Sequence, residues 1–293
     1  MDIALALGGG GSRGYAHVGV LRRLEQAGFK VQAAAGTSAG GIVAVLYAAG
    51  YTPDEMETRF TKLDQSKLFG RLSKDGPGLL GLSGAEKLLV DLFGDRKFED
   101  LKIPCAVVAV DIQAGQEVVL NQGFVVEAIM ATIAIPGIFP PKEYKGTQLV
   151  DGAVLNPVPV SVARSLAPNL PVVAVVLDAT GTQNNGFPNI PLPVQVPGPI
   201  VKSLTRTRVA QAFKIFLKSV DVGSWKLTQL RLLAENPEVI ISPDVSGVGI
   251  LDNVDISKIV HLGEMAAEAS LPDLRRVVAW PNRLQRRVFP RRR

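Results

Sequence analysis

The element best suited to chemistry is a serine enclosed by glycines. Residues 36–40 read GTSAG, so Gly36 and Gly40 lie two positions before and after Ser38. The element follows a predicted strand over residues 31–35 and opens a predicted helix, which is where a nucleophile elbow lies. The two flanking positions must be nearly free of side chain, because the backbones beside such a strained turn pass close together. The pattern predicts Ser38 as a nucleophile, and a plain glycine-rich turn is the alternative.

A second glycine-rich element, GGGGSRG over residues 8–14, follows an apolar strand predicted over residues 3–7. Gly9, Gly11 and Gly14 satisfy the G-x-G-x-x-G pattern of dinucleotide-binding loops. That pattern also needs an acidic residue at the end of the second strand, and the second strand here ends Ala-Ala-Ala-Gly. Nucleotide binding is therefore the weaker of two interpretations of this loop.

The stronger interpretation is an oxyanion hole, because successive glycines expose backbone N–H groups that can converge on a developing negative charge. We expect Gly10 and Gly11 to supply these donors. Arg13 would either steady the loop or contact a phosphate, and the sequence leaves both roles open.

A serine hydroxyl is a weak nucleophile and needs a nearby group that accepts its proton. The chain has two histidines, His17 and His261, and neither follows a strand after the serine, where a triad histidine belongs. We expect structural roles for both. The base should therefore be a carboxylate.

Three aspartates end predicted strands: Asp111, Asp151 and Asp178. Asp151 is the best candidate for the base, because Gly152 lets the chain turn sharply after the strand. Asp111 precedes a hairpin turn and is expected to be structural, and Asp178 opens an irregular segment. An ordinary aspartate pKa of about 3.9 lies far below that of serine. A direct base therefore needs a partly dry site that raises this pKa.

Together, these elements resemble the patatin-like phospholipases over roughly residues 3–180. GGGGSRGYAHVGVL resembles the family's oxyanion loop and first helix, and GTSAG resembles its nucleophile elbow. DGA at 151–153 resembles the family's Asp-Gly-Gly/Ala element, and NPVPV at 156–160 is similar to what often follows it. ATIAIPGIFPP resembles a segment that usually reads A-S-x-A-x-P. Thr132 stands there in place of the serine, and we expect this departure to leave the catalytic pair untouched.

The resemblance implies a dyad of Ser38 as nucleophile and Asp151 as base, with no third member, no metal and no cofactor. It implies a serine acyl hydrolase acting on lipid or other acyl esters, of phospholipase A or lysophospholipase type. Two alternatives use the same scaffold: an acyltransferase with the same dyad, and a catalytically idle protein.

The predicted elements run strand, loop, helix twice over, which is typical of a parallel sheet with helices packed on it. With the resemblance, this predicts an α/β fold, a three-layer α/β/α sandwich with a mainly parallel central sheet. The expected division is a catalytic core over 1–180, a Pro/Gly-rich loop over 181–200, a helical region with one strand packed on the core over 201–280, and a basic tail over 281–293.

The composition fits a globular protein of 293 residues, of which 47% are apolar. The single cysteine, Cys105, allows neither an intrachain disulfide nor a cysteine-based metal cluster. No apolar run approaches the ~18–20 residues of a spanning helix, and the first residues lack the pattern of a secretory signal. We therefore expect a cytoplasmic protein that is soluble or peripheral to the membrane.

The net charge of +5 is concentrated at the C-terminus. Residues 281–293 hold six arginines, and removing them would change the net charge from +5 to −1. A solvated, frayed end is one interpretation. Contact with anionic lipid headgroups is the other. Nothing else in the chain favours nucleic-acid binding, so we expect none.

Overall fold

Large and small apolar residues alternate along strand β1, Asp2–Leu7, and divide the core into two halves. Ile3, Leu5 and Leu7 belong to the larger half, on one face of the sheet. Ala4 and Ala6 belong to the smaller half, on the opposite face. Because successive side chains of a strand point to opposite faces, one strand contributes to both halves.

This computed structural model describes residues 1–65, 68, 78–177 and 208–279. Asp178, the Pro/Gly-rich segment 181–200, the basic tail 281–293 and most of the glycine-containing stretch over 66–77 lie outside the described residues. The expectations that fall on these segments stay expectations.

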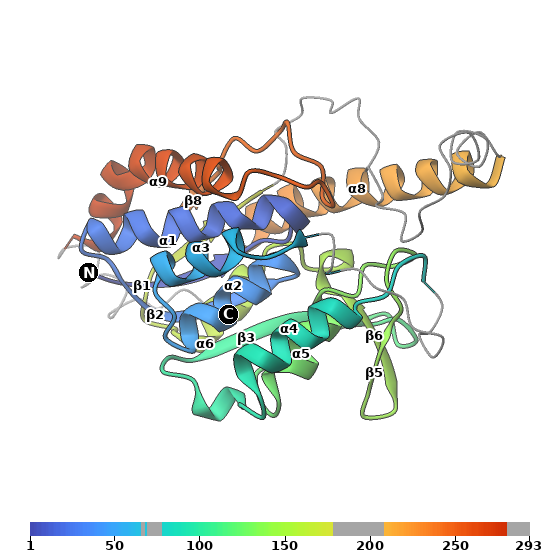
Figure 1. The fold of residues 1–293 in the computed structure, drawn as a ribbon. Helices are drawn as coiled ribbons and strands as arrows, with labels where there is room; N and C mark the ends of the chain where they lie inside the picture. The colour runs from blue at the N-terminus through green and yellow to red at the C-terminus, as the bar shows by residue number, and fades with distance from the viewer. Residues whose placement is uncertain (66–67, 69–77, 178–207, 280–293) are drawn as a thin grey trace.

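The sheet has eight strands in the order β5-β6-β3-β2-β1-β7-β8, with β4 paired to β3. The pairs β1–β2, β1–β7, β2–β3 and β7–β8 are parallel, and the pairs that involve β4, β5 or β6 are antiparallel. Helices cover both faces (Figure 1). The predicted α/β class with a mainly parallel sheet is confirmed. The remaining strands are β2 Lys30–Thr37, β3 Cys105–Asp111, β4 Gln116–Leu120, β5 Lys142–Tyr144, β6 Thr147–Asp151, β7 Val172–Val175 and β8 Val239–Ile241.

The described helices include some that the sequence analysis does not predict. The helix that the sequence analysis expects after Ser38 is α2, whereas α3, α4 and α6 were not predicted. The α-helices are α1 Ala16–Gln26, α2 Ala39–Ala48, α3 Pro53–Thr61, α4 Ser83–Phe93, α5 Val125–Thr132, α6 Val160–Leu166, α8 Arg208–Glu235 and α9 Ile256–Val278. The 3₁₀ turns are η1 Gly11–Tyr15, η3 Phe98–Asp100 and η4 Gly152–Val154.

The register of β3 brings two other strands together end to end. Val108 pairs with β2 and with β4, and Val110 pairs with β4 and with β6. A strand has only two edges, so β2 and β6 share the edge opposite β4. Thr37 ends β2 opposite Val108. Asp151 ends β6 opposite Ala109. Because β2 runs parallel to β3 and β6 runs antiparallel to it, their C-terminal ends meet.

The C-terminal region of the chain adds one strand and two long helices. Strand β8 pairs with β7, and α9 packs on α1 (Figure 1). Helix α8 is mostly exposed: the side chains of Ile215 and Leu233 are 65% and 79% accessible, while Leu217 is buried. Within the described residues, none of the helices combines the length and the apolar character that a membrane span requires.

Helices α1 and α9 cross with their backbones almost in contact. A Cβ atom on Gly19 would lie 1.8 Å from the carbonyl oxygen of Val260. A Cβ atom on Gly263 would lie 1.9 Å from the carbonyl oxygen of Ala16. Each helix therefore contributes a glycine to the crossing, and no larger residue fits without separating the helices.

We predict that Gly19→Ala lowers the free energy of unfolding by about 1–3 kcal/mol, the usual cost of overpacking. The helix propensity of alanine, about 1 kcal/mol better than that of glycine, acts in the opposite direction. Gly223→Ala in α8 is the matched control, because a Cβ atom there meets no atom within 4 Å. Urea unfolding should show a loss for the first variant and no loss for the second. Equal stability of the two would contradict the tight crossing.

Candidate active site

Ser38 lies at a strained turn between β2 and α2. Its backbone has φ 54° and ψ −125°, a conformation that costs a residue with a side chain of order 1–3 kcal/mol. A Cβ atom on Gly36 would lie 2.3 Å from the carbonyl oxygen of Gly40, and one on Gly40 would lie 2.2 Å from that of Leu7. The steric reason given for both glycines is therefore confirmed, and the turn has the form of a nucleophile elbow.

Thr132, at the end of α5, holds the strained turn in place. The Ser38 N–H donates a hydrogen bond to Thr132 Oγ1 over 2.9 Å. The same hydroxyl donates to the carbonyl oxygen of Val108 in β3. Thr132 therefore contacts Ser38 directly, through a hydroxyl that a serine at this position would also carry. The two residues are far apart in sequence, so only the pairing of the strands brings them into contact.

Asp151 faces Ser38 where β2 and β6 meet. Its Oδ1 accepts a 2.9 Å hydrogen bond from the N–H of Ala153, and Asp151 and Ser38 line the same cavity. Asp151 is 3% exposed and Ser38 is 5% exposed. Burial raises the pKa of Asp151 to about 6, while the hydrogen bonds from Ser38 and Ala153 act in the opposite direction. Such a carboxyl is ionised at neutral pH and is a stronger base than an ordinary aspartate.

A close backbone contact lets Asp151 reach this position. A Cβ atom on Gly152 would lie 2.3 Å from the carbonyl oxygen of Val108 and 3.1 Å from the Thr37 side chain. Only glycine allows the chain to turn here over the end of β3. The predicted role of Gly152 in the turn thus has a steric cause.

The glycine loop lies against Ser38. A Cβ atom on Gly9 would lie 3.3 Å from the Cβ of Ser38. The N–H of Gly9 donates a hydrogen bond to the carbonyl oxygen of Pro157 over 3.0 Å. Among the described residues, the N–H groups of Gly10 and Gly11 have no hydrogen-bond partner. These are the two groups that the sequence analysis expects as oxyanion donors.

Arg13 connects the glycine loop to the segment 248–252 by a hydrogen bond. The guanidinium Nε donates to the carbonyl oxygen of Val248 over 2.6 Å, and the side chain is buried. The backbone N–H of Ser12 donates a hydrogen bond to the carbonyl oxygen of Ile250 over 2.9 Å. The Ser12 hydroxyl donates a hydrogen bond to the carbonyl oxygen of Asp252 over 2.8 Å. Of the two roles left open for Arg13, the geometry supports the structural one. The sequence gives no sign of this contact between the loop and residues 248–252.

The other polar residues considered from the sequence lie apart from the pair. His17 is fully buried, and its Nε2 is 2.8 Å from the carbonyl oxygen of Gly8. His261 is exposed on α9 beside Glu264. Asp111 accepts hydrogen bonds from the N–H groups of Gln113 and Ala114 in the hairpin turn. Within the described regions of the chain, no three histidine, cysteine, aspartate or glutamate side chains are arranged to hold a metal.

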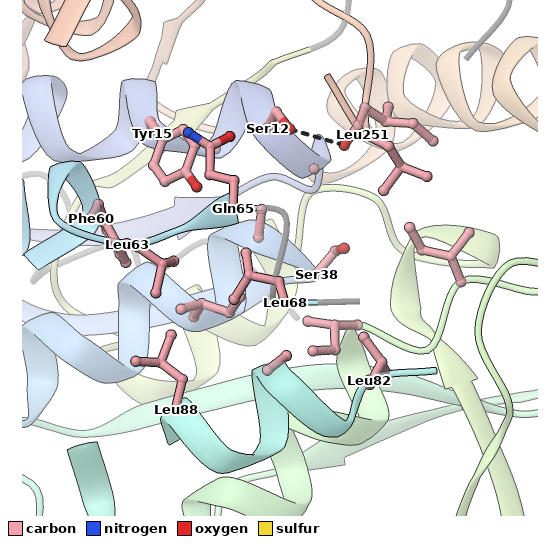
Figure 2. A pocket seen from close by; sticks show the side chains of 18 of the residues that line it. Ser12, Tyr15, Ser38, Phe60, Leu63, Gln65, Leu68, Leu82, Leu88 and Leu251 are labelled. Atoms are coloured by element: carbon pink, nitrogen blue, oxygen red, sulfur yellow. Dashed lines mark hydrogen bonds between the residues drawn. The ribbon is translucent and has the colours of Figure 1, made fainter. Parts of the chain in front are cut away.

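Two cavities have Ser38 in their lining. The first, of about 290 Å³, is lined mainly by apolar side chains from α2, α3, α4 and the segment after α5. Figure 2 shows Ser38 facing this cavity, with Leu63, Leu68, Leu82 and Leu88 around it. The second, of about 140 Å³, also contacts Asp151 and is lined by Arg13 and by Lys218 and Asp221 of α8. Both cavities are thus mainly apolar, and the second also presents the charged side chains of Lys218 and Asp221.

Comparison with known proteins assigns the family. A sequence profile for the family described as "Patatin-like phospholipase" matches residues 5–164, more than half of the chain. The chain therefore belongs to the patatin-like phospholipase family, as its motifs predicted. The crystal structure of VipD from Legionella pneumophila has a similar fold, with a TM-score of 0.59 and 13% identity over 92% of this chain and 66% of that chain.

The curated relatives are longer proteins. The "Uncharacterized NTE family protein Rv2565" of Mycobacterium tuberculosis is 32% identical over 281 residues, covering 93% of this chain and 47% of that protein. The "Uncharacterized NTE family protein Rv1063c" of the same species is 37% identical over 193 residues, covering 64% of this chain and 53% of that protein. The chain spans about half the length of these relatives.

We predict that the Thr132 hydroxyl is needed to hold Ser38. Thr132→Val keeps the shape but leaves a buried N–H and a buried carbonyl without this partner, at a cost of about 1–3 kcal/mol each. Thr132→Ser keeps the hydroxyl. Labelling by a fluorophosphonate probe, normalised to folded protein, should be at least tenfold slower in Thr132→Val and within about threefold of wild type in Thr132→Ser. Equal labelling of the two variants would contradict this role.

The pKa of Asp151 predicts how the reactivity of Ser38 depends on pH. Only the carboxylate can accept the serine proton, so labelling needs Asp151 ionised. The rate should be half of its plateau near pH 6 and should fall about tenfold per pH unit below that. An inflection near pH 4 would mean that the carboxyl titrates like an exposed aspartate. The stability of the protein over the same pH range, followed by circular dichroism, separates acid unfolding from titration.

Proposed function

We propose that this protein is a serine acyl hydrolase that cleaves ester bonds of lipids, with Ser38 as nucleophile and Asp151 as base. The observation that carries the proposal is that Ser38 and Asp151 are both buried and line one cavity at the meeting point of β2 and β6. Membership of the patatin-like phospholipase family supports the lipid class of the substrate.

In the first step, Asp151 accepts the hydroxyl proton while Ser38 Oγ attacks the ester carbonyl carbon. The carbonyl π electrons move to oxygen, and the N–H groups of Gly10 and Gly11 stabilise the oxyanion. When the intermediate collapses, the bond to the alcohol oxygen breaks and Asp151 returns its proton to that oxygen. The alcohol leaves, and the acyl group stays on Ser38.

In the second step, water takes the place of the alcohol. Asp151 accepts a proton from the water as its oxygen attacks the acyl carbon, and the same two N–H groups hold the second oxyanion. Collapse breaks the bond to Ser38 Oγ, which recovers the proton from Asp151. The fatty acid is released, and the serine and the carboxylate are restored.

The two cavities favour a lipid over a small polar ester. An acyl chain fits the apolar cavity of about 290 Å³, since burying each CH₂ group there gains about 0.8 kcal/mol. The alcohol group would occupy the smaller cavity beside α8, where Lys218 and Asp221 offer polar contacts. We therefore expect kcat/KM to rise with acyl chain length until the apolar cavity is filled.

Hydrolysis of p-nitrophenyl esters of increasing chain length tests the proposal. Ser38→Ala and Asp151→Asn should each lower kcat by on the order of 10³-fold or more, as loss of one member of a catalytic unit does. The matched controls are Ser165→Ala, whose hydroxyl bonds to its own helix, and Asp111→Asn, whose carboxylate bonds to its own turn. Both controls should keep wild-type activity. Full activity of Ser38→Ala would reject Ser38 as the nucleophile.

A further inference from the structure

His17 is a buried polar residue to which the proposed mechanism assigns no step. It is the second residue of α1, and its ring is completely buried beneath the glycine loop. Its Nε2 lies 2.8 Å from the carbonyl oxygen of Gly8. A carbonyl only accepts hydrogen bonds, so Nε2 carries the proton and donates it.

The other ring nitrogen of His17, Nδ1, lowers the stability of the folded protein. Nδ1 is buried and has no hydrogen-bond partner among the described residues. A buried polar atom without a partner costs about 1–3 kcal/mol, and an apolar side chain of similar size would avoid this cost. The hydrogen bond that Nε2 makes to Gly8 is therefore what the histidine provides here.

That hydrogen bond fixes one peptide group at both ends. The oxygen of the Gly8–Gly9 peptide is held by His17, and its N–H is held by the carbonyl oxygen of Pro157. The next two N–H groups along the chain belong to Gly10 and Gly11. On their far side, the carbonyl oxygen of Gly10 accepts a 3.2 Å hydrogen bond from the N–H of Arg13. The direction of the two free N–H groups is thus set from both sides.

We infer that His17 is a positioning residue for the oxyanion hole: through the Gly8 carbonyl, it aims the N–H groups of Gly10 and Gly11 at the reacting carbonyl. The inference rests on the proposed function. Charge develops on the substrate oxygen only as the serine attacks, so misdirected donors weaken binding of the transition state more than binding of the substrate. His17 therefore acts on kcat and leaves KM almost unchanged.

His17 does not serve as a second base. Its protonated nitrogen is directed at a carbonyl oxygen, and the carboxylate that faces Ser38 is Asp151. Burial lowers the pKa of His17 to about 4, more than the hydrogen bond to Gly8 raises it. The ring is therefore neutral above pH 5, and Nε2 keeps its proton over the working range.

Two variants separate positioning from packing. His17→Leu fills the space without a donor, and His17→Gln places an amide N–H close to the position of Nε2. With p-nitrophenyl butyrate, His17→Leu should lower kcat at least tenfold with KM within twofold of wild type, and His17→Gln should recover most of the loss. Both variants should keep the acid limb of the pH profile near pH 6, because that limb belongs to Asp151. His261→Gln is the control for an exposed histidine.

Binding of a trifluoromethyl ketone gives a second readout, because its adduct with the serine carries an oxyanion. Its affinity should fall in parallel with kcat in His17→Leu. A folded His17→Leu with wild-type kcat and ketone affinity would overturn the inference and leave the proposed function intact. A wild-type protein that neither hydrolyses esters nor reacts with a fluorophosphonate would instead overturn the proposed function. If His17→Leu does not fold, His17→Asn replaces it, since its shorter side chain falls short of Gly8, and equal kcat for Asn and Gln would overturn the inference.

Discussion

The candidate site depends on one feature of the sheet: two strands end against each other along a single edge of β3. Strand β2 delivers Ser38, and strand β6 delivers Asp151 from the opposite direction. Each residue lies at or next to the end of its strand, so a short side chain is enough to bring the two together. The strands position both groups, so little conformational freedom is left to be lost when a substrate binds.

This arrangement also sets the acid–base properties of the proposed Ser38–Asp151 pair. Two strand ends that meet inside the protein exclude water, and burial raises the pKa of Asp151 to about 6. Burial of a carboxyl usually disfavours its charged form, and here the hydrogen bonds from Ser38 and Ala153 limit that effect. The carboxyl is thus basic enough to accept a proton and still ionised at neutral pH. Among the described residues, neither His17 nor His261 lines the cavities at Ser38.

The sequence predicts those features of the site whose causes are local. GTSAG and the Asp-Gly turn could be identified because each depends on neighbours within a few residues, and the close contacts of Gly36, Gly40 and Gly152 confirm the steric reason. The role of Thr132 could not be found in this way, because its contact with Ser38 depends on the pairing of β2 with β3. Helix α3 was missed although its signal is local. Thr52 and Glu55 form a capping box around Pro53, which is typical of a helix start.

The largest feature that the sequence did not predict is the contact of the C-terminal region with the glycine loop. Residues 248–252 lie beyond the family match at 5–164, yet their carbonyl groups hold Ser12 and Arg13. The loop continues directly into η1 and α1, and residues 248–252 lead within a few residues into α9. The glycine crossing of α1 and α9 therefore fixes both sides of this contact at once. The packing of α1 on α9 and these hydrogen bonds thus tie the glycine loop, which belongs to the first half of the chain, to the second half.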